Sequence, residues 1–279
     1  MPPTFNSSLY YYAPVTLIYV PCESVETYKN DDNWSKYSYY ITCHHTNDDN
    51  VITYKAGNKL EETQDTSGLH TNAFFDENGN QLNMVSHTFD DSNGIGTITF
   101  NGSIGVVGDY AFYECYGMTS VELPNNVTYI GDSAFQECQN LVSIDIPNNV
   151  TYIGESAFSY CQNLRNVTLG DSVEIIGDSA FTYCNNMTSV EIPNSVTHIS
   201  DYAFANCPSL RKVTLGDSVE IIGESAFQDC SNLADINIPN SVLVIGNSAF
   251  NNTTLNDDAK LKIGEINSQA LGGGVQPQT

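Results

Sequence analysis

Hydrophobic positions recur with a fixed period of 23 residues over residues 95–250. Within one period, Ile144 and Ile146 alternate with Ser143 and Asp145, and this alternation predicts a half-buried strand. Pro or Gly ends each such strand, and a second extended segment follows, as at residues 150–153. An Ala-Phe pair then closes each period, with evenly spaced aromatic positions at Phe112, Phe135, Phe158, Phe181, Phe204, Phe227 and Phe250.

The segment between the second strand and the next period is predicted to turn a corner. We expect Gly154 to adopt an unusual backbone angle there, and Ser156 to cap a single helical turn. Ala157, Phe158 and Cys161 would then fall on one face and point inward. A lone coil cannot bury that face, so the coils must stack into a solenoid.

The motif I-P-x-x-V-x-x-I-G-x-x-A-F-x-x-C-x-x-L, repeated over residues 95–250, resembles the leucine-rich repeats of BspA-like bacterial surface proteins. The resemblance implies a β-rich α/β fold, a leucine-rich repeat solenoid of 23-residue coils. It also implies a secreted or cell-surface location and, for some members, adhesion to host matrix proteins. It carries over no binding residue, because the shared positions all belong to the core.

Residues 1–43 have a different pattern, rich in Tyr and containing the sole Trp of the chain, Trp34. Residues 16–20 and 37–42 are predicted strands, and residues 24–28 a short helix. The run from Ile18 to Trp34 resembles the segment that closes many BspA-like arrays. We expect either that the chain is cut from a longer one with an earlier array upstream, or that this α+β region is an N-terminal cap.

The remaining boundaries follow from the same patterns. Residues 44–94 are predicted to form irregular β structure that leads into the array. The solenoid is expected over residues 95–271, because residues 266–271 echo the corner motif of residues 245–250. Residues 272–279 are predicted to be a disordered tail.

Composition excludes several classes of partner. The net charge of −24 argues against nucleic-acid binding and against docking to anionic lipid. No apolar run is long enough to span a membrane, so no membrane insertion is expected. The first residues lack the basic segment of a signal peptide. We expect a monomer.

Six cysteines follow the period, at Cys115, Cys138, Cys161, Cys184, Cys207 and Cys230. Parallel coils would hold their Cβ atoms about 4.8 Å apart, wider than the roughly 3.5–4.5 Å of a disulfide. We therefore predict buried, reduced thiols. Cys22 and Cys43 lie outside the ladder, and whether they pair stays open.

No catalytic set, cofactor or metal site is predicted. Cys43, His44 and His45 lie near two aspartates, but adjacent histidines on a strand point to opposite sides, so a solvated loop is expected. No nucleophile with a base, glycine-rich phosphate loop or paired carboxylate stands out. We expect no enzyme activity, although a hydrolase site within residues 1–94 is kept as a minor alternative.

Basic residues are scarce in the array: between residues 95 and 250 they are Arg165, Arg211 and Lys212. All three precede or begin predicted strands, at positions that face the concave side. Either coil duplication placed the charge twice and solvent surrounds it, or the two arginines form an acid-recognising patch about 10 Å apart. Glu191 lies between them and could pair with either. The candidate binding residues are Arg165, Thr168, Glu191, Arg211, Lys212 and Thr214.

Two functions fit these patterns. The first is a non-catalytic extracellular binding or adhesion module that recognises a host extracellular-matrix protein or glycan through the concave strands. The second is a structural spacer within a larger cell-surface protein, whose exposed strands bind nothing.

Overall fold

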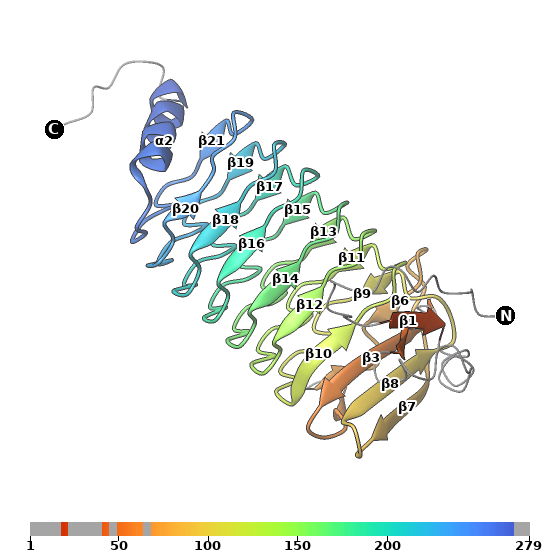
Figure 1. Cartoon of the computed structure of the whole chain (residues 1–279). Coiled ribbons are helices and arrows are strands. Elements are labelled where there is room, and N and C mark those ends of the chain that lie inside the picture. The colour runs from red at the N-terminus through yellow and green to blue at the C-terminus, as the bar shows by residue number, and fades with distance from the viewer. Residues whose placement is uncertain (1–17, 22–40, 45–48, 64–67, 271–279) are drawn as a thin grey trace, which may run out of the picture. The chain divides into compact units, whose positions relative to one another are not determined.

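The computed structural model describes residues 18–21, 41–44, 49–63 and 68–270 (Figure 1). The chain divides into one unit of residues 1–48 and another of residues 49–279. In the first unit, β1 (Ile18–Pro21) pairs in parallel with β2 (Ile41–His44). The predicted helix at 24–28, Trp34, Cys22 and the predicted tail at 272–279 lie outside the described residues.

Coils of 23 residues stack regularly in the second unit, and the solenoid fold is confirmed. The strands predicted from the first alternation line one side, which we call the strand face (Figure 1). Their bounds are β10 (Met118–Glu122), β12 (Ser143–Asp145), β14 (Asn166–Thr168), β16 (Ser189–Glu191), β18 (Lys212–Thr214) and β20 (Asp235–Ile236).

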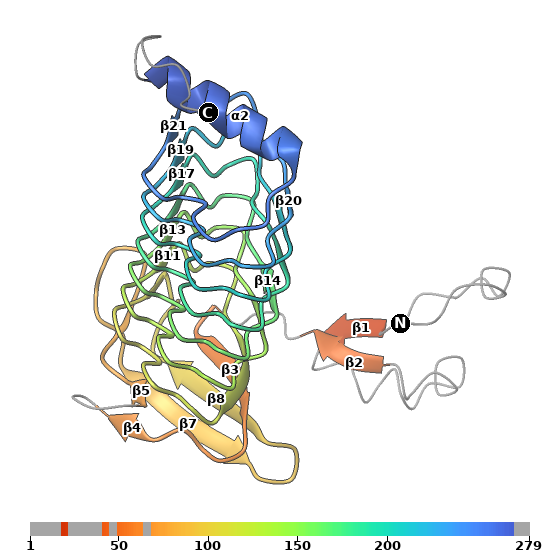
Figure 2. The same ribbon diagram turned by 90° about the vertical axis from the view of Figure 1, so that its left-hand side faces the viewer.

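The second extended segment of each coil forms a parallel sheet on the opposite side, which has the same register throughout because each coil has the same length. Figure 2 shows the two sides, with this sheet apart from the strand face. Its strands are β9 (Val106–Val107), β11 (Tyr129–Ile130), β13 (Tyr152–Ile153), β15 (Ile175–Ile176), β17 (His198–Ile199), β19 (Ile221–Ile222) and β21 (Val244–Ile245).

Antiparallel strands begin the array. On the strand face, β3 (Val51–Ala56) pairs antiparallel with β10, and β8 (Ile95–Phe100) and β7 (Met84–Asp90) extend the sheet beyond it. On the opposite side, β6 (Phe74–Phe75) pairs antiparallel with β9, while β4 (Glu62–Thr63) and β5 (Leu69–His70) pair in parallel. Strands β3, β8, β7 and β6 thus continue the two sheets past the first coil, while β4 and β5 form a separate two-stranded sheet.

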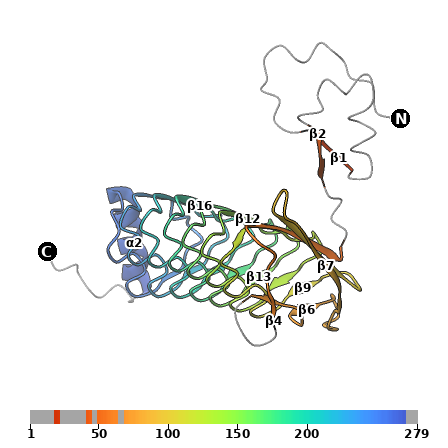
Figure 3. The ribbon, with the colours of Figure 1, turned by 90° about the horizontal axis from the view of Figure 1, so that it is seen from below.

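A helix, α2 (Asp257–Ala270), follows the last coil (Figure 3). The Asn256 side chain accepts a hydrogen bond from the Ala259 N–H at 2.9 Å and so caps the helix N-terminus. Ala259 and Ile266 are buried. The expectation that residues 266–271 repeat the corner motif is therefore wrong: Ile266 covers the end of the array as part of a helix.

The corner also differs from its prediction. Alternate N–H groups, those of Ser156 and Phe158, donate to carbonyls of the following coil at 2.8 and 2.7 Å, so no helical turn forms. Positive φ angles fall at Ser156 (55°) and Tyr160 (59°), and not at Gly154. Gly154 serves close packing instead, because a Cβ there would lie 2.5 Å from the carbonyl carbon of Gly131.

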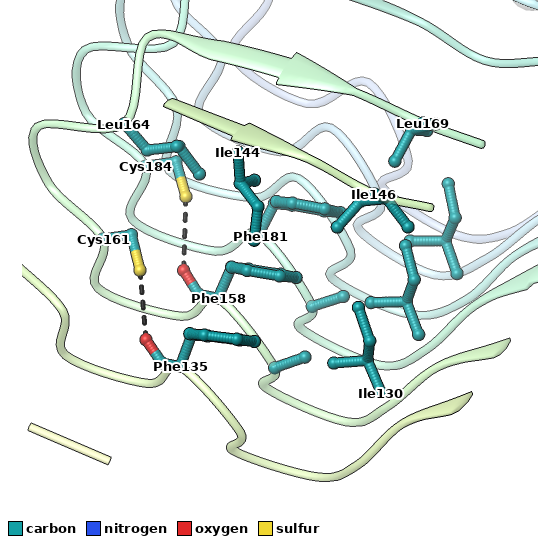
Figure 4. Close-up of a cluster of buried hydrophobic side chains, with 14 of the residues drawn as sticks. Ile130, Phe135, Ile144, Ile146, Phe158, Cys161, Leu164, Leu169, Phe181 and Cys184 are labelled. Atoms are coloured by element: carbon teal, nitrogen blue, oxygen red, sulfur yellow. Dashed lines mark hydrogen bonds between the residues drawn. The ribbon is translucent and has the colours of Figure 1, made fainter. Parts of the chain in front are cut away.

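The core is the predicted aromatic ladder (Figure 4). The rings from Phe112 to Phe250 stack with centroids 5.0 to 5.4 Å apart. The six periodic cysteines are buried and free, as predicted. Each Sγ from Cys138 onward donates to the carbonyl of the Phe in the preceding coil, at 3.1 to 3.3 Å. The cysteine therefore ties neighbouring coils together as well as filling space.

Candidate functional site on the strand face

The outward positions of the strand face carry polar side chains that reach solvent. In β14 these are Asn166 and Thr168, and in β16 they are Ser189 and Glu191, all exposed. Their inward neighbour in β16, Val190, is buried. The alternation in the sequence thus assigned these positions to the correct side of the sheet.

A groove of about 950 Å³ lies on this face, over β14, β16 and β18 and the turns that follow them. Three of the predicted binding residues line it, namely Thr168, Glu191 and Thr214. The turns add Asp171 and Asp217. No Lys or Arg lines the groove, so its charge is negative.

Arg165, Arg211 and Lys212 stand apart from the groove, at the starts of the strands. All three are exposed, and Lys212 forms an ion pair with Asp235 at 4.0 Å. Among the described residues, Glu191 makes no ion pair with either arginine. The predicted residues therefore form two groups: cations at the beginning of the strands and a polar, acidic groove at their end.

The groove extends over an interruption of the sheet and also reaches Leu215 and Asn237 at the next junction. Strands β12 and β14 pair in register, as do β16 and β18, but β14 and β16 are edges of separate sheets. On the opposite side of the coils, β15 and β17 pair without a break. The opening is thus confined to the strand face.

This interruption was not predicted from the sequence. A signal does exist in the turns that follow β12 and the later strands, where Pro and Gly alternate as Pro147, Gly170, Pro193, Gly216 and Pro239. A Cβ at Gly170 or Gly216 would collide with the carbonyl of the preceding proline. Each glycine coil therefore sits tightly on the proline coil before it, and the interrupted junction between β14 and β16 lies on the other side of the Gly170 coil.

Outside the array, the structure brings together three titratable side chains that sequence reasoning left scattered. The Tyr54 hydroxyl and His87 Nε2 are 2.7 Å apart, and His87 Nδ1 lies 2.8 Å from a Glu62 oxygen. The Leu60 N–H donates to the Tyr54 oxygen at 3.1 Å. Burial lowers the pKa of His87, against the opposing effect of its bond to Glu62.

This network is closed. A neutral His87 can donate a hydrogen bond from Nδ1 to Glu62 and accept one at Nε2 from the Tyr54 hydroxyl. Both ring nitrogens then have a hydrogen-bond partner. Tyr54 is 1% exposed, so its hydroxyl has no access for a substrate. We conclude that the three residues stabilise the strands before the array.

Two other classes of site are absent from the described part of the chain. No group of three His, Cys, Asp or Glu side chains is placed to hold a metal ion there. Within the same residues, no helix has the length and apolar character needed to cross a bilayer. Of the predicted solvated loop, His45 and Asp48 lie outside the described residues.

Comparisons with solved structures identify similar solenoids. A T. pallidum leucine-rich repeat protein is 31% identical, covering 60% of this chain and 78% of its own, with a TM-score of 0.57. Leucine-rich repeat proteins from Bacteroides ovatus and Eubacterium ventriosum are 25% and 28% identical, with TM-scores of 0.50 and 0.51. Those matches cover 71% and 55% of this chain, which spans about half of each, 56% and 42%.

No curated protein matches the chain significantly. The family model described as BspA type leucine rich repeat region does match, in six copies, over residues 80–188 and 157–271. The matched residues include every coil described above and the strand face with its groove. The chain therefore belongs to the BspA-type leucine-rich repeat family, whose members are generally non-enzymatic repeat proteins.

Proposed function

We propose that this chain is a non-catalytic binding module, secreted or displayed at the cell surface, that adheres to a host extracellular-matrix protein or glycan through its strand face. One observation carries the proposal: the groove over β14, β16 and β18. Its volume, about 950 Å³, lies within the roughly 300–1,000 Å³ that ligand sites occupy. The apolar positions of the repeat motif are committed to the core.

The distribution of charge defines the partner further. Arg165 and Arg211 present planar donors at the start of the strands, suited to carboxylate or sulfate groups. The groove at the end of the strands, with Asp171, Glu191 and Asp217, suits neutral or donor groups. A ligand that crosses the face along the strand direction would meet both regions. The cell-surface location rests on the resemblance to BspA-like surface proteins.

The test is a binding screen of the full chain, as a monomer, against a panel of extracellular-matrix proteins and glycans. Any ligand found is then measured against a variant with Thr168→Trp and Thr214→Trp, which fills the groove. The matched control places Trp at two exposed positions on the opposite side, Glu174→Trp and Glu220→Trp. We expect the first variant to lose affinity more than tenfold and the control to bind like the parent.

Equal loss in both variants would show that binding does not use the strand face. Absence of any ligand across the panel would favour the alternative, a spacer between parts of a larger surface protein.

A further inference from the structure

Two junctions on the strand face have nearly identical glycine coils, followed by proline coils that differ in sequence. Residues 167–181 and 213–227 are the same except at one acidic position, Asp178 against Glu224. Each glycine coil is followed by a proline coil. The residue that faces the glycine coil's strand end is Glu191 at the first junction and Asn237 at the second. Nearly the same glycine coil thus meets two different strand ends within one chain.

At the second junction, the Asn237 side chain completes the backbone of Leu215. The Leu215 N–H donates to Asn237 Oδ1 at 2.8 Å, and Asn237 Nδ2 donates to the Leu215 carbonyl at 3.0 Å. One carboxamide therefore satisfies both polar groups of a buried residue. Strands β18 and β20 also pair here.

At the first junction, the corresponding backbone is left open. Leu169 is buried and lines the groove. Within the described residues, neither its N–H nor its carbonyl has a hydrogen-bond partner. Glu191 offers acceptor oxygens alone when ionised, so it cannot reproduce both bonds that Asn237 makes. Leu169 therefore brings an unpaired donor and an unpaired acceptor to the groove, where a ligand group that both donates and accepts could bind them.

We propose that the groove binds the primary carboxamide of an Asn or Gln side chain from a protein partner, held by the N–H and carbonyl of Leu169 as Asn237 is held by those of Leu215. This deepens the proposed function and rests on it. A primary carboxamide can make both bonds, because it has an N–H on the same side as its oxygen. A trans secondary amide, as in a peptide bond or an N-acetyl sugar, points the two to opposite sides.

The charge of the groove agrees with this choice. Asp171, Glu191 and Asp217 line it without a cation. A ligand carboxylate would be repelled there, whereas the second N–H of a carboxamide finds acceptors nearby. The groove is therefore expected to discriminate Asn and Gln from Asp and Glu.

The test uses small probes that need no identified partner. In amide-resolved NMR spectra of the full chain, the Leu169 N–H signal should shift saturably with propionamide, in the millimolar range expected for so small a ligand. Propionate and N-methylpropionamide should leave it in place, and Leu215 should respond to none of them. The peptide Gly-Gly-Gln-Gly-Gly should act like propionamide, while Gly-Gly-Glu-Gly-Gly and chitobiose should not.

Reciprocal variants supply the control. Glu191→Asn should fill the first junction from within and abolish the Leu169 response, with the remaining spectrum preserved. Asn237→Glu should open the second junction, so that Leu215 now responds to propionamide. The proposal is overturned if Leu169 does not respond to propionamide, if Glu191→Asn leaves its response intact, or if chitobiose alone shifts it. These small probes do not test the macromolecular ligand. A failure here would therefore overturn the carboxamide proposal alone, and the binding screen would still test the proposed use of the strand face.

Discussion

At the scale of single residues, each repeated side chain has a physical reason. The phenylalanines stack at about one coil spacing, and the cysteines add a hydrogen bond to the preceding coil, as Cys184 does to Phe158 at 3.3 Å. Alanine could fill part of the space but could not donate. Burial raises the pKa of the Cys161 and Cys184 thiols, so these two remain protonated and keep that donor.

Phe181→Ala tests the ladder. Phe181 is fully buried between Phe158 and Phe204, with centroids 5.1 and 5.2 Å away. We expect the variant to lose about 3–5 kcal/mol of unfolding free energy in urea titrations, as other buried aromatics do. Val142→Ala, at a 41% exposed position, is the control and should change it by less than about 0.5 kcal/mol. Equal, small losses in both variants would contradict the ladder as the core.

His87 gives the fold a dependence on pH. Burial lowers the pKa of His87 in the folded protein from its ordinary value of 6.5. At a pH between the folded pKa and 6.5, the unfolded chain therefore binds a proton at His87 that the native state does not bind. This stability is complete above about pH 6.5 and is lost as pH falls from there through the folded pKa. Comparing urea midpoints at pH 8 and pH 5.5, we expect a larger fall for the parent than for His87→Gln. Identical falls would show that His87 is not the group responsible.

At the scale of elements, the sequence predicted what periodicity controls. The two strands of each coil, the aromatic core and the outward positions were all predicted from spacing, because stacking forces one answer on every coil. The helix α2 was missed because residues 266–271 echo the corner motif of residues 245–250, although the echo comes two residues early for a 23-residue coil. The groove was missed because it depends on one exposed residue, Glu191. Its counterpart Asn237 bonds instead to the backbone of Leu215 at the next junction.

Gly170 offers a test of close packing between coils. A Cβ there would collide with the carbonyl of Pro147, whereas one at Gly117 would meet nothing within 4 Å. Gly170→Ala should therefore lower the thermal midpoint by several degrees, while Gly117→Ala should leave it unchanged or slightly raised. A midpoint for Gly170→Ala at or above that of the parent would show that neighbouring coils tolerate wider spacing.

At the scale of the whole molecule, the packed core of the array holds an exposed strand face in place. The chain as a whole has a net charge of −24. Cations are rare enough that their placement matters: Arg165 and Arg211 both flank the strand face. The groove itself is acidic, so the molecule presents two signs of charge on one side. A partner of this face would therefore contact residues outside the repeat motif, because the motif itself forms the core.

Charge reversal tests the arginines. For a ligand that the screen finds on the strand face, Arg165→Glu with Arg211→Glu should slow association by about tenfold or more at low salt. The melting temperature should hold, since both positions are exposed. The control, Lys260→Glu with Lys262→Glu on α2, makes the same change in net charge. If both variants slow association equally, overall charge and not the patch is responsible.

The unpaired backbone of Leu169 is the central feature of the groove, and hydrogen exchange of the Leu169 N–H measures it directly. Leu169 and Leu215 each follow a Thr and so share nearly the same intrinsic exchange rate. In the free chain, we predict rapid exchange of the Leu169 N–H. The Leu215 N–H should be strongly protected, because it donates a hydrogen bond to Asn237 Oδ1. Equal protection of the two amides would contradict an open junction between β14 and β16.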